Sequence, residues 1–176
     1  MTLLALVHDV LERRTIAHAL IGAAALAVHG VVRSTVDIDL LAVDPACLEP
    51  TLWDDLRRSG VGVDIRHGDG DDPLAGVVRL TAERSRDVDL LVGRDRWQLA
   101  AIGRARSIQV FGAELPVVSA ADLTLLKLFA GGPQDSWDVQ QLLAADSGAS
   151  LVDAVERLLP DLPERSRQIW RALTGR

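Results

Sequence analysis

The sequence predicts an α/β (α+β) fold, in which a small mixed β-sheet is flanked by helices and followed by a helical C-terminal extension. Two observations predict it. Short apolar runs that alternate like strands recur between helical segments as far as Val118, and from Ser119 onward the apolar period changes from two to about 3.6. We therefore expect a core over residues 1–118 and a helical extension over residues 119–176 that packs on it. A chain of 176 residues can bury a sizeable core.

Each element follows from its apolar spacing and from the residues at its ends. Spacing typical of one helix face, with glycine or proline at the boundaries, predicts helices over residues 1–14, 22–30, 45–60, 95–106, 119–131, 135–146, 150–160 and 163–175. Alternating or continuous apolar runs predict strands over residues 18–22, 36–43, 61–68, 77–81 and 86–93, and a hairpin over 107–118 that turns at Gly112. Residues 68–72, with three aspartates, predict an exposed turn.

The composition excludes several classes of protein. A formal net charge of −6 argues against a protein that coats extended duplex DNA through many phosphate contacts. Cys47 is the only cysteine, which excludes an internal disulfide and a cysteine-based zinc site, and we expect it in the core. No apolar run is long enough to cross a bilayer, and the N-terminus lacks the pattern of a signal peptide. We expect a cytoplasmic protein that has no membrane partner.

Asp37 and Asp39 lie two apart within the apolar run of residues 36–43. Side chains two apart on a strand share one face, so the two carboxylates repel each other and neither is easily removed from water. A strand end tolerates such a pair when it is solvated or when it holds a cation. The sequence around the pair bears on which of these applies.

The segment from Gly22 to Val43 forms a unit that can hold a nucleoside triphosphate. A glycine starts a short helix, a turn with Arg33 and Thr35 follows, and a strand carries the two aspartates. Backbone N–H groups at a helix start bind phosphate, and carboxylates on one strand face can bridge magnesium ions.

This unit resembles the signature of the DNA polymerase β-like nucleotidyltransferase superfamily, which has glycine followed by glycine or serine, a short helix, and aspartate-x-aspartate on a strand. Gly22-Ala23 and Asp37-Ile38-Asp39 stand in the two places. The likeness is greatest to compact bacterial enzymes of the abortive-infection, toxin type. Ala23 departs from the pattern, because a serine hydroxyl that would bind phosphate is missing.

The resemblance implies a nucleotidyltransferase core, two-metal phosphoryl transfer and a third carboxylate on a neighbouring strand. Asp89, embedded among aliphatic residues, fits that place better than Asp87, which follows a polar turn. Two Mg²⁺ ions would be held by the residues we also expect to be catalytic: Asp37, Asp39 and Asp89. The expected nucleotide-binding residues are Gly22, Ala23, Arg33, Thr35 and Lys127.

Several of these residues also have structural interpretations. Lys127 is the only lysine among 19 basic residues, and it either faces the triphosphate or extends from a mostly buried helix into solvent. Arg33 either binds phosphate or caps the preceding helix. Asp135 is expected to cap a helix, with Asp138 in its first turn, although the family often places acidic residues there. The four histidines show no metal-ligand spacing, and His29 is expected to pack near a helix end.

Three functions remain open from the sequence. The first is a nucleotidyltransferase that moves a nucleoside monophosphate from a nucleoside triphosphate to a hydroxyl of RNA, protein or a small molecule, with an antitoxin protein as a partner if the enzyme is a toxin. The second is a non-catalytic nucleotide-binding module of the same fold, which the missing hydroxyl at Ala23 favours. The third is a drug-modifying, aminoglycoside-type nucleotidyltransferase.

Overall fold

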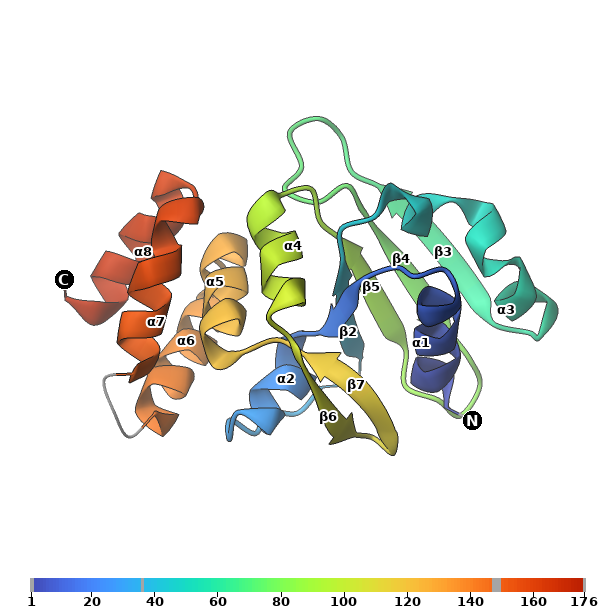
Figure 1. Ribbon diagram of the computed structural model, residues 1–176, viewed down its shortest axis with the longest axis horizontal. Helices are drawn as coiled ribbons and strands as arrows, with labels where there is room; N and C mark the ends of the chain where they lie inside the picture. Colours follow the sequence, from blue (N-terminus) through green and yellow to red (C-terminus); the bar gives the residue numbers. More distant parts are fainter. Residues whose placement is uncertain (1, 36, 147–149, 176) are drawn as a thin grey trace.

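A mixed seven-stranded sheet carries the fold (Figure 1). The computed structural model describes residues 2–35, 37–146 and 150–175; Met1, Val36 and Arg176, which belong to predicted segments, lie outside the described residues. The strands are β1 (His18–Leu20), β2 (Ile38–Ala42), β3 (Gly62–His67), β4 (Gly76–Thr81), β5 (Val88–Val92), β6 (Arg106–Val110) and β7 (Ala113–Val117). Their order in the sheet is β3-β4-β5-β2-β1-β7-β6. The β2–β5 and β1–β7 pairs are parallel and the other pairs are antiparallel.

Eight α-helices accompany the sheet within the described residues. They are α1 (Leu3–Arg13), α2 (Gly22–Val28), α3 (Asp54–Arg58), α4 (Arg96–Gly103), α5 (Ala120–Ala130), α6 (Pro133–Ala145), α7 (Ser150–Leu158) and α8 (Glu164–Thr174). The predicted fold class is confirmed, and so is the hairpin, in which Phe111 and Gly112 adopt positive φ angles of 52° and 78° between β6 and β7. None of the described helices has the length and apolar character that spanning a membrane requires.

The prediction of one helix over residues 45–60 is wrong. Two 3₁₀-helical turns, Pro45–Leu48 and Pro50–Trp53, precede the five-residue helix α3. Pro50 is the cause, because proline has no N–H for the helix ladder and pushes the residue before it into an extended conformation, here φ −80° and ψ 123° at Glu49. The segment is held instead by a fully buried Trp53, whose indole N–H donates to the Cys47 carbonyl at 2.9 Å.

The two faces of the sheet differ in chemistry. Leu40, Val78 and Leu90 point to one face and are fully buried. On the opposite face, Asp39 and Asp89 alternate with leucines and are only partly covered. Strand alternation thus places the acidic side chains on one face of β2 and β5 together with the buried Leu41, and keeps the other face fully apolar at Leu40, Val78 and Leu90.

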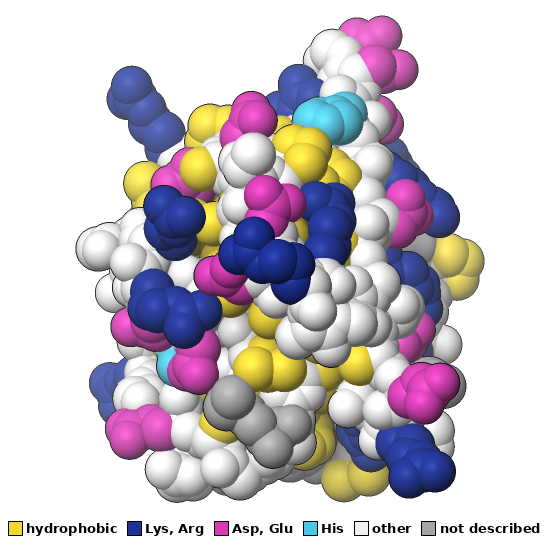
Figure 2. Space-filling model, turned by 90° about the vertical axis from the view of Figure 1, so that its right-hand side faces the viewer, with side chains coloured by type: hydrophobic (Ala, Val, Ile, Leu, Met, Phe, Trp, Pro, Cys, Tyr) yellow, Lys and Arg dark blue, Asp and Glu magenta, His cyan; other side chains and the backbone are white. Residues whose placement is uncertain are grey.

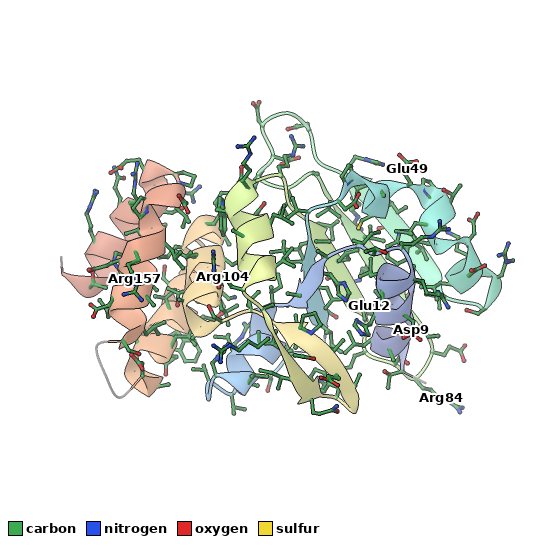
Figure 3. All side chains as sticks on the ribbon, in the orientation of Figure 1. Asp9, Glu12, Glu49, Arg84, Arg104 and Arg157 are labelled. Carbon is green, nitrogen blue, oxygen red and sulfur yellow. The ribbon has the colours of Figure 1, made fainter. Side chains whose placement is uncertain are left out.

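The C-terminal helices begin where the period changes. Ser119 caps α5 by accepting the Asp122 N–H, and Gly131 ends the helix in the left-handed conformation with φ 68°. Helix α5 contacts α2 and also α6, α7 and α8, which lie at the opposite end of the molecule from β3 (Figure 1). The Arg104 guanidinium, at the end of α4, binds the buried Asp122 carboxylate at 2.6 Å (Figure 3). The domain boundary at residue 118 stays a prediction.

Candidate active site

Asp39 and Asp89 lie side by side on the parallel strands β2 and β5. The register pairs these two residues directly, so their side chains occupy one face of the sheet. Asp37 and Asp87 lie at the start of the same two strands, where the Ile38 N–H donates to the Asp87 carbonyl at 2.9 Å. The carboxylates of Asp37, Asp39, Asp87 and Asp89 therefore form one cluster, the acidic group. The choice of Asp89 as the third carboxylate requires such a cluster.

The acidic group holds more negative charge than its surroundings compensate. Burial, and then the charge of Asp89, raises the pKa of Asp39 above its ordinary value, while the positive charges of Lys127 and Arg33 act in the opposite direction. Burial also raises the pKa of Asp89, against the opposing charge of Arg79. Asp89 Oδ1 is buried and has no hydrogen-bond partner among the described residues. A cation at this oxygen would relieve both effects.

Arg79 is part of the site, and the sequence analysis missed it. It lies on β4 directly opposite Asp89. Its guanidinium is 3.3 Å from Asp37 Oδ1, 3.1 Å from Asp87 Oδ2 and 3.5 Å from Asp89 Oδ2. The signal in the sequence was an arginine in the middle of an otherwise apolar strand. Its partners depend on the strand order, which local patterns do not contain.

Carboxylate oxygens are the kind of ligand that a hard divalent cation prefers, but the carboxylates of the acidic group are spread too widely to surround an ion as they stand. Oxygen ligands are those that Mg²⁺ prefers, and the unpartnered Asp89 Oδ1 is one such donor. Among the described residues, however, ligand atoms of three aspartates do not gather within 4.8 Å of one another. Arg79 holds an oxygen of Asp37 and one of Asp89. Binding of Mg²⁺ there would require the guanidinium to share or leave these oxygens.

Gly22 brings the start of α2 against Asp39. The Ile21 N–H donates to the Asp39 carbonyl at 3.0 Å, and Gly22 follows with a φ of +64°. A Cβ at Gly22 would collide with the Asp39 carboxylate, so both the conformation and the close approach require glycine. The side chain of Ala23 is buried in the core, 1% exposed. Only the backbone of Ala23 is thus placed to contribute to this turn.

A pocket of about 260 Å³ opens beside this turn. Gly22, Asp39, Gln98, Lys127 and Asp135 contribute its polar groups. Most of its wall is apolar and comes from β2, β5, α5 and the loop before β4, with the side chains of Leu41, Leu74, Leu91, Leu126 and Phe129. A flat ring could lie against this wall while charged groups bind at the end near Gly22.

Lys127 lines the pocket and is bound to two carboxylates of α6. Its Nζ lies 2.9 Å from Asp135 Oδ1 and 2.8 Å from Asp138 Oδ2, and its side chain is 12% exposed. Burial acts to lower the pKa of Lys127, but hydrogen bonds to Asp138 and Asp135 raise it above the ordinary value. The interpretation of Lys127 as a side chain that extends into solvent is therefore wrong. Its binding to phosphate stays a prediction.

Arg33 and Thr35 shape the turn before β2. Arg33 Nε is 3.8 Å from Asp138 Oδ1 and has no hydrogen-bond partner among the described residues. The Thr35 hydroxyl donates to the Asp37 carbonyl at 2.9 Å, which fixes the backbone next to the acidic group. A guanidinium with an unused donor fits an anion at this position. Contact of Thr35 with the nucleotide stays a prediction.

Two structural expectations need correction. Asp135 is not the N-cap of α6, because the helix begins at Pro133 and Gly132 is the capping residue; the Asp135 carboxylate instead accepts the Gly132 N–H at 3.1 Å, and Asp138 lies in the second turn rather than the first. The four histidines show no metal-ligand spacing in the sequence, but the fold brings His8 Nδ1 and His18 Nε2 to 2.8 Å from each other. His29 follows α2, and its ring donates to the Val118 carbonyl at 2.8 Å.

Comparison with known proteins identifies the fold. No family model matches this sequence, and no curated protein matches it. An antigenic nucleotidyltransferase-like protein from Paracoccidioides brasiliensis matches in structure with a TM-score of 0.50, at 15% identity, over 98% of this chain and 94% of its own. This chain has the nucleotidyltransferase fold. The predicted resemblance to the superfamily is thereby confirmed at the level of the fold.

Two further solved structures match this chain with lower TM-scores. The antibiotic-resistance factor ANT(2'')-Ia has a TM-score of 0.48 and 13% identity, over 97% of this chain and 90% of its own. The lincomycin-bound lincosamide antibiotic adenylyltransferase LnuA has a TM-score of 0.48 and 15% identity, over 81% of this chain and 95% of its own. Both identities are too low to carry a substrate role over to this chain.

Proposed function

We propose that this protein transfers a nucleoside monophosphate from a nucleoside triphosphate to a hydroxyl acceptor. The observation that carries the proposal is the direct pairing of Asp39 with Asp89 beside the positive-φ turn at Gly22, on a nucleotidyltransferase fold. Backbone N–H groups of such a turn and carboxylates that can hold a divalent cation are both suited to bind a triphosphate. The apolar pocket next to them has room for a ring of the substrate.

Each residue of the candidate site has its own role in the proposed transfer reaction. Asp37 and Asp39 would hold Mg²⁺, which when bound would neutralise charge on the triphosphate. The acceptor oxygen forms a bond to the α-phosphorus, the bond from that phosphorus to the bridging oxygen breaks, and pyrophosphate leaves. Asp89 takes the proton of the hydroxyl, a role consistent with a carboxyl whose pKa burial raises. Arg33 and Lys127 lie near Asp39 and are placed to compensate phosphate charge.

The acceptor is the finer part of the proposal. We place the protein in the cytoplasm and assign it an RNA end or a protein as acceptor, as in the toxin-type enzymes that the sequence resembles, with an antitoxin protein as regulator. A drug-modifying activity would use the same acidic group with a different acceptor. The label-transfer experiment below separates these outcomes.

A non-catalytic nucleotide-binding module is the second candidate, and Arg79 is the observation that favours it. The guanidinium contacts three carboxylates of the acidic group and compensates charge that would otherwise attract metal ions. If Arg79 remains in place, the fold could bind a nucleotide through Gly22 and the pocket without transferring it.

The test is incorporation of label. The protein is incubated with Mg²⁺ and each of the four α-³²P-labelled ribonucleoside triphosphates, with total RNA, total protein or a panel of aminoglycosides and lincosamides as acceptor. We expect one triphosphate to label one acceptor class, and Asp39→Asn to abolish the labelling. Magnesium-dependent triphosphate binding without any transfer would support the non-catalytic module, and absence of both binding and transfer would refute both candidates.

A further inference from the structure

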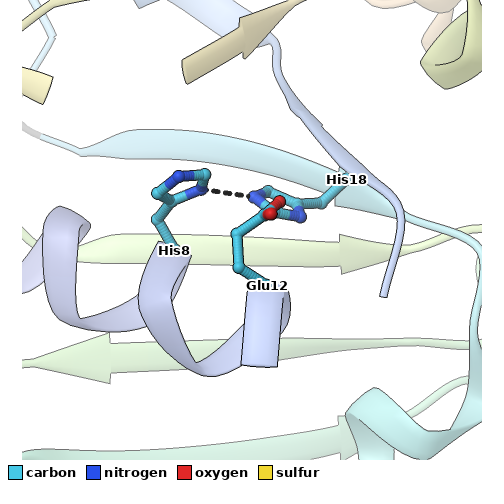
Figure 4. Close-up of side chains that lie close together, drawn as sticks. All are labelled: His8, Glu12 and His18. Carbon is cyan, nitrogen blue, oxygen red and sulfur yellow. Dashed lines mark hydrogen bonds between the residues drawn. The ribbon is translucent and has the colours of Figure 1, made fainter. Parts of the chain in front are cut away.

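A second group of metal-ligating side chains lies away from the acidic group. His8 and Glu12 are on α1, and His18 is on β1. Because His8 and Glu12 are four residues apart on a helix, they share one face. Figure 4 shows both side chains extending from α1 toward the ring of His18.

The ligand atoms of these three residues converge. His8 Nδ1 lies 2.8 Å from His18 Nε2, and one ligand atom from each of His8, Glu12 and His18 can be chosen so that all three lie within 4.8 Å of one another. Among the described residues, no other three histidine, cysteine or acidic side chains come so close together. Two imidazoles and one carboxylate form a known ligand set for zinc sites with three protein ligands.

The ring of His18 is already oriented for coordination. Its Nδ1 donates a hydrogen bond to the Ile16 carbonyl at 2.8 Å, which leaves the lone pair of Nε2 directed at His8. A backbone carbonyl that holds the second nitrogen of a ligating histidine is a common supporting contact in metal sites, because it fixes both tautomer and ring orientation. His18 is also 3% exposed, so a ligand on Nε2 would be shielded on that side.

A hydrogen bond between the two rings is the simpler interpretation, and it explains part of the arrangement. It explains the approach of His8 to His18, but it gives no role to the Glu12 carboxylate beside them. In a tetrahedral zinc site with bonds of 2.0–2.1 Å, ligand atoms are roughly 3.3 Å apart, so the two nitrogens would need to separate by only about 0.5 Å. His8 is partly exposed and Glu12 is exposed, so both can make this adjustment.

We propose that His8, Glu12 and His18 bind one divalent transition-metal ion of the zinc class, with water in the remaining position. Imidazole nitrogens select zinc and its neighbours over Mg²⁺, which prefers oxygen ligands. The ion would tie α1 to β1, the strand that leads into the turn at Gly22. Its role is therefore to stabilise the fold.

This site is separate from the acidic group and does not depend on the proposed function. His18 pairs with Ala42 in the sheet, and Ala42 is three residues from Asp39 on the same strand. An odd separation on a strand places the two side chains on opposite faces. The metal site thus lies on the face covered by α1, and the acidic group lies on the other face.

The test measures metal binding directly, with a full-length chain that carries no polyhistidine tag. Zinc is titrated by calorimetry, and Co²⁺ is added separately because its visible absorption reports nitrogen ligands and low coordination number. We expect one equivalent of zinc in the wild type and in an Asp37→Asn/Asp39→Asn variant. His8→Ala should weaken binding at least about 100-fold and Glu12→Gln at least about tenfold, since each removes a ligand. At zinc concentrations about 100-fold above the wild-type Kd, the melting temperature should rise by about 5 °C or more in the wild type and in the Asp37→Asn/Asp39→Asn variant, and by much less in His8→Ala.

His67→Ala is the matched control, because His67 is exposed at the end of β3 and should leave zinc binding unchanged. Equal zinc affinity in the wild type and in Glu12→Gln would overturn the proposal even if His8→Ala failed to fold. Loss of binding in His67→Ala would assign the ion to the surface and would overturn it as well. So would the absence of zinc binding and of a cobalt spectrum in the wild type.

Discussion

The acidic group contains carboxylates whose burial lowers the stability of the folded protein, and an arginine whose positive charge offsets part of that loss. Asp39 and Asp89 have raised pKa values because burial disfavours their charged forms. Arg79 compensates the outer part of the group, but Asp89 Oδ1 remains without a partner among the described residues. Such residues are kept at a cost in stability when the chemistry of a site requires them.

Asp39→Asn tests this cost. The folded-state pKa of Asp39 lies above the unfolded value, so the folded protein binds the proton more tightly, and ionised Asp39 lowers the free energy of unfolding at any pH above that pKa. The substitution should raise the melting temperature by a few degrees at pH 7 and by less at pH 4, while abolishing transfer. Differential scanning calorimetry at both pH values measures this. Asp64→Asn, an exposed carboxylate opposite Arg79, is the control that should change neither property. A lower melting temperature for Asp39→Asn at pH 7 would show that the charge is compensated.

Arg79→Gln tests whether the guanidinium competes with metal ions. Removing the positive charge leaves Asp37, Asp87 and Asp89 without this partner, so Mg²⁺ should bind at least about fivefold more tightly in the absence of nucleotide. Calorimetric titration with MgCl₂ measures the affinity. Arg66→Gln, on the neighbouring strand and largely exposed, should have little effect. Weaker magnesium binding in Arg79→Gln would mean that Arg79 organises the carboxylates for the ion.

Lys127→Arg tests the need for a compact ammonium. Nζ fits between Asp135 and Asp138 with both contacts under 3 Å, and a planar guanidinium is wider. We expect triphosphate affinity to fall at least about tenfold, equivalent to roughly 1.4 kcal/mol, as the pocket changes shape. Arg157→Lys on the exposed side of α7 is the control (Figure 3). Matching binding curves for wild type and Lys127→Arg would remove Lys127 from the nucleotide site.

At the level of elements, the sequence predicted what local signals determine. The period change at Ser119, the turn at Gly112 and the alternation in the strands all correspond to observed boundaries. The helix predicted over residues 45–60 does not match the observed boundaries, because Pro50 interrupts it. The partners of Arg79 and the meeting of His8 with His18 depend on strand order and on packing between distant segments, which no local pattern encodes.

The cap of α5 provides a test at this scale. The Ser119 hydroxyl donates to Asp122 Oδ2 at 2.6 Å and accepts the Asp122 N–H at 3.1 Å, so it connects the helix start to the ion pair of the buried Asp122 with Arg104. Ser119→Ala should lower the free energy of unfolding by about 1–2 kcal/mol. Urea denaturation measures it, with Ser136→Ala in the first turn of α6 as the control. A loss no larger than that of the control would mean that the ion pair alone fixes the helix.

For the whole molecule, the candidate catalytic residues lie on one face of the sheet and the His8–His18 contact lies on the other. One face carries Leu40, Val78, Leu90 and the His8–His18 contact, while the other carries the acidic group and the pocket beside the buried Leu41. The surface at the end with α3 and β3 has basic and acidic side chains interspersed, without a large area of one sign (Figure 2). On this face there is no basic surface of the kind that holds a long duplex, in agreement with the net charge of −6.

The catalytic assignment depends on Asp89, which only the pairing of β2 with β5 brings next to Asp39. The decisive measurement compares single-turnover transfer and triphosphate binding for Asp89→Asn and Asp87→Asn. If Asp89 accepts the acceptor proton, Asp89→Asn should lower the rate at least about 100-fold and change triphosphate Kd by less than about threefold, since its contribution is made in the transition state. Asp87→Asn should lower the rate by less than about tenfold. Full activity in Asp89→Asn, or a greater loss in Asp87→Asn, would contradict the proposed site.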